Sequence, residues 1–179
     1  LTFTAGQATS TFAVGDISAT GTGDCTLSSF QTSSTTVYTV ICTPDGEGTV
    51  IIVVAAAAFT DEAGNSNTVS NTYNWNHDVT DPSVSSISIP GGDYAVGDTV
   101  AVTITAGETG LSCTACTLNG VALTGLTDNS DNTYTATYTV VEGHTDRAAG
   151  ATPGSIVLAD SAGNTNSAYT TITEAAAVT

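Results

Sequence analysis

FTDEAGNSN, at residues 59–67, returns 99 residues later in the chain as LADSAGNTN, at residues 158–166. A second pair of matching segments, LTFTAGQ at residues 1–7 and VTITAGE at residues 102–108, is offset by 101 residues. Because two distant landmarks agree on one period, the chain is predicted to be a tandem array of two repeats. A period of about 100 residues suits one immunoglobulin-sized β-sandwich per repeat.

Both repeats have the alternation that is typical of β-strands. Thr, Val, Ile and Ser alternate, clusters of Gly, Asn and Asp separate the alternating runs, and no stretch has the period of an amphipathic helix. In the second repeat this pattern predicts strands at residues 83–89, 99–106, 112–118, 121–126, 134–141, 155–159 and 168–173. Seven strands are the number in a constant-type immunoglobulin topology. The predicted fold class is therefore all-β, with two tandem immunoglobulin-like β-sandwiches.

The first repeat matches the second only from its second strand onward, because residues 1–5 align with the strand at residues 99–106. We therefore expect an N-terminally incomplete sandwich at residues 1–77 and a sandwich with its incoming linker at residues 78–179. An exposed strand edge is a template for another strand. Two sources for the missing strand stay open: preceding residues of the same polypeptide, or residues 168–179 donated by a neighbouring copy.

The chain is strongly acidic. Its 17 Asp and Glu residues stand against one Lys or Arg, which gives a formal net charge of -16 at pH 7. Nucleic acid is therefore not an expected partner, because phosphate binding needs Lys and Arg. Cations are the expected partners of such an acidic chain. Hydrophobic residues make up 40% of the chain, which places the acidic side chains on folded domains rather than on a disordered segment.

Cysteine usage favours an exported protein. The four Cys residues fall two in each repeat, as expected for one disulfide in each domain. The absence of Met and of a signal-peptide pattern suggests a processed chain or an excised segment. The longest apolar run, at residues 50–59, is too short to cross a bilayer as a helix, so no direct membrane insertion is expected.

The first Cys pair suits a disulfide across a hairpin. Strands at residues 25–30 and 37–42 would place Cys25 directly opposite Cys42. A cross-strand disulfide between them is therefore predicted.

The second Cys pair has a tighter spacing. Cys113 and Cys116 lie three residues apart, or about 10 Å along an extended strand, so a disulfide between them requires a turn at residues 114–115. Zinc binding by the four Cys residues is the competing interpretation. It is disfavoured because the pairs lie in different repeats and because neither His77 nor His144 has a suitable spacing.

Four segments carry a resemblance to a known family: GTVI at residues 48–51, AFTDEAGN at 58–65, DVTDP at 78–82 and YTATYTVVEG at 134–143. In these segments the chain resembles the bacterial Ig-like repeats of giant surface adhesins and biofilm-associated proteins. The resemblance implies an extracellular or cell-surface location, a role as an extension segment, and Ca²⁺ binding at or near the junctions between repeats. The paired Cys residues and the missing opening strand depart from that family.

Strand direction predicts where acidic side chains gather. The loops after the second, fourth and sixth strands of the second repeat return to the end at which the linker enters, and Ca²⁺ binds six to eight carboxylate, amide and carbonyl oxygens. The predicted Ca²⁺ ligands at this junction are Asp78, Asp81, Glu108, Asp160 and Asn164, and the half-built counterpart in the first repeat has Asp61, Glu62 and Asn65. The Asp-x-Ala-Gly-Asn pattern is also typical of a tight turn, which stays open as the alternative.

Catalysis has little support in the sequence. The two His residues fall in a linker and a loop, and neither has a Ser-containing elbow motif beside it. Trp75 and Tyr73 could stack on a carbohydrate, but an aromatic pair in a last strand more often covers the core. The chain is therefore not expected to be an enzyme.

Taken as a whole, the sequence predicts an extracellular structural repeat module, part of a Ca²⁺-stiffened surface rod, sheath or lattice. Its expected partners are neighbouring repeats or copies of itself. Two alternatives stay open: a self-assembling filament or surface-layer subunit that uses strand exchange, and an adhesin module that binds a glycan or a host surface.

Overall fold

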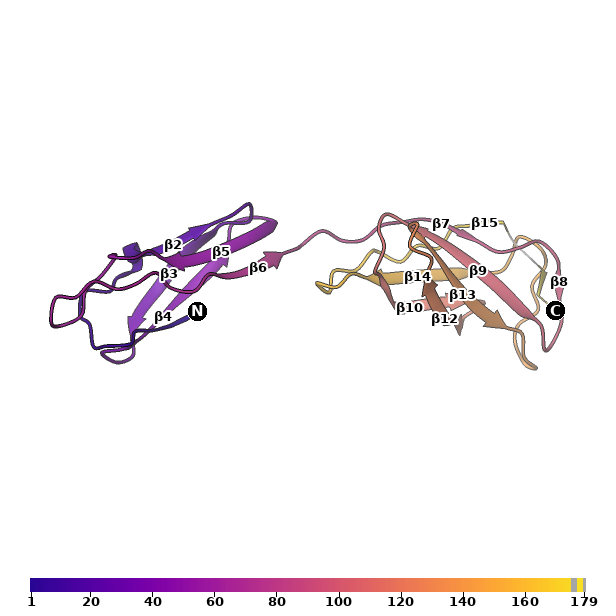
Figure 1. Ribbon diagram of the computed structural model, residues 1–179. Helices are drawn as coiled ribbons and strands as arrows, with labels where there is room; N and C mark the ends of the chain where they lie inside the picture. Colours follow the sequence, from indigo (N-terminus) through magenta and orange to yellow (C-terminus); the bar gives the residue numbers. More distant parts are fainter. Residues whose placement is uncertain (175–176, 179) are drawn as a thin grey trace. The chain divides into compact units, whose positions relative to one another are not determined.

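A computed structural model describes residues 1–174 and 177–178 of the chain (Figure 1). The chain forms two compact units, Leu1–Val79 and Thr80–Thr179, and the division falls two residues beyond the expected boundary. Both units are built from β-sheets, which confirms the predicted all-β fold class. No helix in the described part of the chain is long and apolar enough to span a membrane.

Unit 1 consists of two three-stranded sheets. One sheet has the order β1-β4-β3 and the other the order β2-β5-β6. The elements are β1 (Thr2–Thr4), the short 3-10 helix η1 (Val14–Asp16), β2 (Ile17–Thr20), β3 (Cys25–Thr32), β4 (Val37–Pro44), β5 (Gly48–Val54) and β6 (Tyr73–His77). All neighbouring strands in these sheets are antiparallel.

The core of unit 1 follows from the alternation along its central strands. In β5 every second side chain is buried, and Val50, Ile52 and Val54 are at most 3% exposed. A period of two places these side chains on one face of the sheet. Phe12 packs edge-to-face on Tyr38 of β4, with ring centroids 5.0 Å apart. Aliphatic and aromatic side chains together fill the space between the two sheets.

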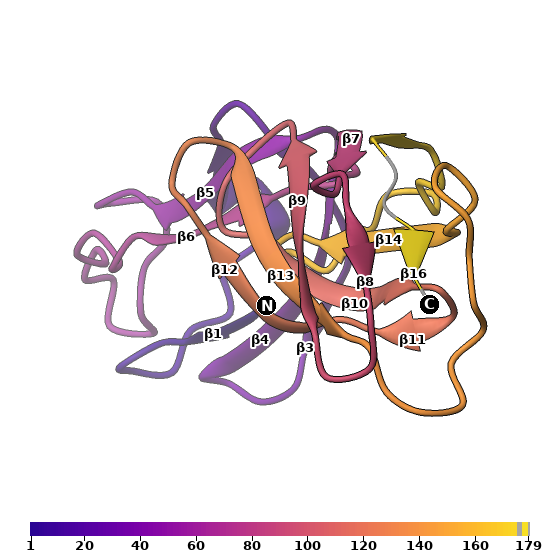
Figure 2. The same cartoon turned by 90° about the vertical axis from the view of Figure 1, so that its right-hand side faces the viewer.

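Unit 2 has a five-stranded sheet of order β12-β13-β9-β7-β15 and a three-stranded sheet of order β11-β10-β14. A short pair, β16 beside β8, lies next to them (Figure 2). The strands are β7 (Val84–Ser88), β8 (Asp93–Tyr94), β9 (Thr99–Ala106), β10 (Ser112–Leu118), β11 (Val121–Ala122), β12 (Thr124–Asp128), β13 (Thr133–Thr139), β14 (Gly154–Ala159), β15 (Ile172–Glu174) and β16 (Ala177–Val178). Each of the predicted ranges overlaps a strand, whereas β8 and β16 were not expected.

The core of unit 2 contains side chains from both of its larger sheets. Val100, Val102 and Ile104 alternate along β9 and are fully buried. β7 contributes Ile87, which is 1% exposed, and Ile89, which follows the strand and is fully buried. The first strand and the residue that follows it therefore each contribute one aliphatic side chain to this core.

Each unit has a tyrosine at the equivalent position, which shows how their strands correspond. Tyr38 lies opposite Phe3 of β1, and Tyr134 lies opposite Ile104 of β9. The Tyr38 hydroxyl donates to a backbone carbonyl at 2.6 Å, and the Tyr134 hydroxyl does so at 3.0 Å. β1 is therefore the counterpart of β9. In the described part of unit 1, no strand takes the place that β7 has beside β9, as the sequence predicts.

The hairpin that contains the first Cys pair has a different register from the predicted one. Cys42 pairs with Leu27 rather than with Cys25. The reason is the offset at the turn, where Thr32 pairs with Tyr38, together with a bulge inside β3 between Ser28 and Gln31, in which Ser29 has φ 53°. The two Cys residues therefore lie diagonally across the strands instead of directly opposite each other.

The second Cys pair is brought together by a β-bulge instead of the expected turn. Cys113 pairs with Leu158 and Ala115 pairs with Val157, which leaves Thr114 as an extra residue in β10. A bulge of this kind shortens and bends a strand locally without ending its pairing. The predicted turn at residues 114–115 is therefore wrong.

Candidate functional site

The repeated phrase folds into the same hydrogen-bonded turn in both units. In unit 1 the Asp61 carboxylate accepts the backbone N–H groups of Ala63 and Asn65, at 2.9 and 2.8 Å, and the Asn65 side chain donates to its other oxygen at 2.9 Å. In unit 2 the Asp160 carboxylate accepts three consecutive N–H groups, at residues 162–164, over 2.7 to 2.9 Å. The side-chain amide of the last of these residues donates to the second carboxylate oxygen at 2.8 Å. Both acidic side chains thus close a turn.

The same hydrogen bonds affect protonation. They lower the pKa of Asp61 and of Asp160 below the ordinary value of 3.8. The largest cause is the side-chain bond from Asn65 in the first case and from Asn164 in the second, with backbone N–H groups adding to it. Hydrogen bonds to the charged form favour that form, so both groups act as ionised acceptors at neutral pH.

We expect Asp160→Asn to lower the melting temperature at pH 7, because an amide is a weaker acceptor and its NH₂ group would face the Asn164 amide. Since the folded-state pKa of Asp160 is lowered, its stabilisation is present above pH 3.8 and is lost as the pH falls below that value. The difference in melting temperature between variant and parent should therefore become smaller as the pH falls from 7 to about 3, which thermal melts measure.

Melts in Ca²⁺ and in EDTA are the control for this variant. A turn acceptor gives the same gap in both solutions. A gap that disappears in EDTA would assign Asp160 to a metal site instead.

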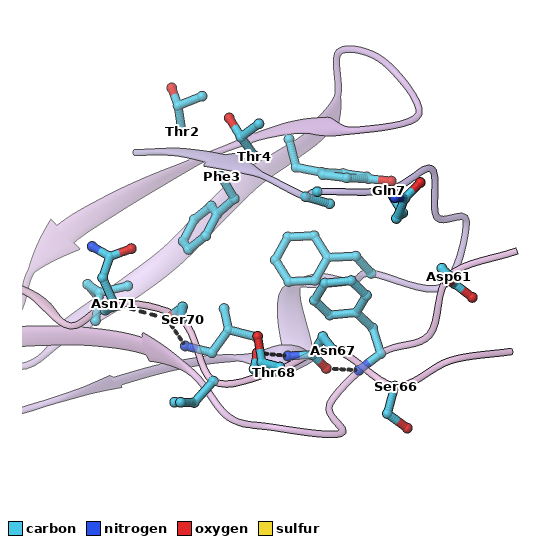
Figure 3. Close-up of a pocket in the computed structure, with 18 of the residues that line it drawn as sticks. Thr2, Phe3, Thr4, Gln7, Asp61, Ser66, Asn67, Thr68, Ser70 and Asn71 are labelled. Atoms are coloured by element: carbon cyan, nitrogen blue, oxygen red, sulfur yellow. Dashed lines mark hydrogen bonds between the residues drawn. The ribbon is translucent and has the colours of Figure 1, made fainter. Parts of the chain in front are cut away.

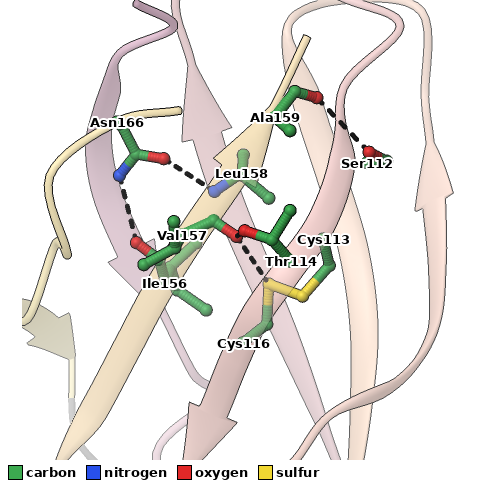
Figure 4. Close-up of a disulfide and its surroundings, with 9 residues drawn as sticks. All are labelled: Ser112, Cys113, Thr114, Cys116, Ile156, Val157, Leu158, Ala159 and Asn166. Atoms are coloured by element: carbon green, nitrogen blue, oxygen red, sulfur yellow. Dashed lines mark hydrogen bonds between the residues drawn. A yellow bond between two sulfur atoms is a disulfide. The ribbon is translucent and has the colours of Figure 1, made fainter. Parts of the chain in front are cut away.

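A second asparagine fastens each turn to the sheet. Asn166 is 8% exposed, accepts the N–H of Leu158 at 2.6 Å and donates to the carbonyl of Ile156 at 3.1 Å (Figure 4). In unit 1, Asn67 accepts the N–H of Phe59 at 2.9 Å. The sequence interpretation gave neither residue a role. Their recurrence at the end of both copies of the phrase is the signal that identifies them.

The acidic loops of unit 2 gather at the end where the linker enters. The N–H of Gly107 donates to the carbonyl of Ser83 at 2.9 Å, and the N–H of Gly110 donates to the carboxylate of Asp128 at 2.6 Å. β10 begins opposite the end of β14, directly before the turn at residues 160–164. These contacts tie three loops to the start of the unit.

The predicted Ca²⁺ ligands lie in pairs or singly. In the part of the chain that the structure describes, no three His, Cys, Asp or Glu side chains are close enough to hold a metal ion together. Asp61 with Asn65, and Asp160 with Asn164, are hydrogen-bonded pairs. Of the remaining predicted ligands, Asp81, Glu108 and Glu62 are exposed and Asp78 is half-buried. Ca²⁺ binding therefore stays a prediction.

Both predicted disulfides are present. The Cα atoms of Cys25 and Cys42 lie 5.6 Å apart, and those of Cys113 and Cys116 lie 5.9 Å apart. The second bond spans the bulge in β10, where the sulfur of Cys116 lies 3.6 Å from the carbonyl oxygen of Val157 (Figure 4). Because every Cys is paired, no thiolate is left for zinc.

The His and Arg side chains make structural contacts. A ring nitrogen of His144 lies 2.8 Å from the hydroxyl of Tyr138, and the two rings stack. The Nε of Arg147 donates to the side-chain oxygen of Asn119 at 3.0 Å. In unit 1 the ring of His77 lies 2.9 Å from a backbone carbonyl oxygen. These contacts hold loops in place.

An apolar groove of about 670 Å³ opens beside β1 in unit 1 (Figure 3). Figure 3 shows Phe3 directed into it, whereas Thr2 and Thr4 lie on the other side of the strand. Its apolar lining includes Phe3, Phe12, Tyr38, Ile52, Val54 and Phe59. The polar segment at residues 65–71 forms the facing rim.

Comparison with known families finds a similarity that covers unit 1. Residues 1–76 match the family model of the bacterial Ig-like domain. No curated protein and no solved structure matches the chain. Domains of the matched family are typically non-enzymatic and commonly extracellular. The match supports a bacterial Ig-like domain, and it does not distinguish adhesins from other proteins that contain such domains.

Proposed function

We propose that the chain is a structural repeat module of an extracellular array, in which its β-sandwich units act as spacers. One observation carries the proposal: the phrase that recurs in both units has the same architectural role in each. Asp61 and Asp160 close the turns, and Asn67 and Asn166 fasten them to the sheets. What the array repeats is a structural turn, as a spacer requires.

The electrostatic part of the proposal is that divalent cations stabilise the array. Clustered carboxylates repel one another, and bound cations offset that repulsion. The oxygens of Asp61 and Asp160 already accept N–H groups. Cations would therefore bind to acidic side chains that the turns do not use, such as the exposed Asp81 and Glu108 on the linker side of unit 2.

Removal of Ca²⁺ tests this part. Extracellular Ca²⁺ sites bind at roughly 10⁻⁴ to 10⁻³ M, so about 1 mM Ca²⁺ should stabilise the fold by about 0.4 to 1.4 kcal/mol per site. We expect chelation to lower the melting temperature of the 179-residue chain at constant ionic strength.

Two variants locate the effect. The double variant Asp81→Asn, Glu108→Gln should lose the response to Ca²⁺. Glu142→Gln, which alters an exposed carboxylate in the loop after β13, should keep it. An unchanged melting temperature on chelation would exclude a cation-stabilised array and leave the acidic side chains as turn acceptors and solubilising surface.

Carbohydrate binding is the second candidate function. The ring of Tyr73 is 54% exposed and its centroid lies 5.7 Å from that of Trp75. Exposed aromatic rings can stack on sugars, with Tyr and Trp each offering an apolar face and a polar tip. A glycan array separates the two functions, because a spacer gives no selective signal.

A further inference from the structure

The first sheet of unit 1 has an open edge at β1. Leu1 exchanges backbone hydrogen bonds with Val40 of β4, at 2.8 and 3.1 Å. The N–H of Ala5 donates to the carbonyl of Thr36, the residue directly before β4. Since the backbone groups of alternate residues point to opposite edges of a strand, Thr2 and Thr4 present theirs to the other side. In the described residues no strand pairs with that side of β1.

The edge continues into the apolar groove. Aromatic and aliphatic side chains of the first core, among them Phe3, Tyr38 and Val54, line it. At its margin Leu1 is 37% exposed and Val69 is 60% exposed. An open strand edge above an apolar groove is the arrangement that receives an added β-strand, because the backbone supplies hydrogen bonds and the groove receives alternate side chains.

Unit 2 contains a strand at the equivalent place. Thr103 and Thr105, the counterparts of Thr2 and Thr4 in the repeat, pair with β7. Ile87 of β7 pairs with Ile104, the counterpart of Phe3. The side chains of Ile87 and Ile89, two residues apart, are buried in the core. The occupant that this position accepts is therefore an extended segment with the pattern Ile-x-Ile, antiparallel to its neighbour.

We propose that the groove of unit 1 is a strand seat, meaning a site that receives such a strand. The strand is supplied by the connecting segment from the repeat that precedes unit 1 in the array. The inference rests on the proposed function, because an array places a connecting segment before each unit. The segment that leads into unit 2 has this role there: residues 78–83 pass directly into β7. The incoming segment pairs antiparallel with β1 and inserts two aliphatic side chains beside Phe3.

The C-terminal segment of a second copy fits this position less well. In residues 168–179, Ile172 is followed two residues later by Glu174, so the Ile-x-Ile pattern would be replaced by Ile-x-Glu. Part of this segment lies outside the described residues. Within them, β15 already pairs with β7, in parallel, and Ile172 packs on the core of unit 2. Donation would therefore break contacts in one unit and bring a carboxylate to an apolar groove in the other.

An N-terminal fusion tests the proposal on the full chain. A copy of residues 80–101 placed directly before Leu1 enters in the register of the repeat, in which Leu1 corresponds to Val102. We expect the amide protons of Thr2 and Thr4 to exchange at least about tenfold more slowly, and unit 1 to melt at a higher temperature, because the open edge becomes paired.

The matched control carries Ile87→Asp and Ile89→Asp in the added copy only. It should give neither effect. Equal protection of the Thr2 and Thr4 amides in both fusions, or no protection in either fusion, would overturn the proposed strand seat. Protection of Thr2 and Thr4 in the unmodified chain that rises with protein concentration, together with a dimer in sedimentation, would assign the seat to a second copy and overturn the neighbouring-repeat source. A glycan-array signal or an absent Ca²⁺ response would bear on the proposed function alone and would leave these readouts unchanged.

Discussion

Asn166→Ala should lower the free energy of unfolding of unit 2 by about 2 to 4 kcal/mol, because it leaves two buried backbone groups without a partner. The side chain is 8% exposed and bridges the N–H of Leu158 and the carbonyl of Ile156. A buried donor or acceptor that loses its partner costs about 1 to 3 kcal/mol. Hydrogen exchange of the Leu158 amide, measured with increasing denaturant, reports the change within unit 2.

Asn67→Ala is the matched control in unit 1. Asn67 accepts the N–H of Phe59 in the same way, but its donor contact, to Ala55, lies at an exposed position, where water can replace the lost partner. The loss should therefore be smaller, about 1 kcal/mol. Equal losses at the two positions would contradict the view that burial makes Asn166 the stronger anchor.

The double variant Cys25→Ala, Cys42→Ala should destabilise unit 1 by about 3 kcal/mol, because the disulfide restricts the unfolded chain. The two residues are 17 positions apart, which is the longer of the two disulfide loops. Trp75 is the single Trp of the chain and belongs to unit 1, so its fluorescence follows the unfolding of that unit in denaturant.

The corresponding double variant Cys113→Ala, Cys116→Ala should cost less, about 2 kcal/mol, because its loop spans only 3 positions. It is measured in unit 2 by hydrogen exchange. The bulge at Thr114 should keep its pairing register, since β10 remains bonded to β14 on both sides of it. A larger loss in unit 2 than in unit 1 would contradict the loop-length argument.

The strands of this protein could be predicted because their pattern is local. The predicted ranges of β9 and β10 agree with the structure, and in β9 the alternation also gives the side chains that are buried. The missing opening strand could also be predicted, because the alignment of Leu1 with Val102 needs only the repeat. Periodicity and repetition are properties of the sequence alone.

Bulges could not be predicted in the same way. Ser29 has a positive φ without being Gly or Asn, so its residue type gives no signal of the bulge that helps to set the register of Cys25 and Cys42. Thr114 is likewise an ordinary strand residue that becomes the extra residue of a bulge. Such shifts follow from the joint fit of two strands and a disulfide, which one strand's pattern does not contain.

In the candidate site, too, the sequence predicts the position of the acidic side chains but not the role of each one. Strand direction brings the loops of Glu108, Asp128 and Asp160 to one end of unit 2, a result of topology. The use of each carboxylate depends on its immediate N–H donors. The pattern Asp-x-Ala-Gly-Asn is compatible with a turn and with a cation ligand, and only the positions of the amide groups at residues 162–164 indicate the turn.

The contact between Arg147 and Asn119 has a consequence for the proteolysis of the chain. Trypsin-like proteases cleave after Lys or Arg, and Arg147 is the single residue of either type in the chain. Its side chain is half-buried and donates to Asn119 at 3.0 Å, which fixes the loop around the one susceptible peptide bond. A protease must extend such a loop before it can cut. Cleavage at this one site therefore requires the hydrogen bond between Arg147 and Asn119 to open, while Ala148 and Gly150 beside it are already exposed.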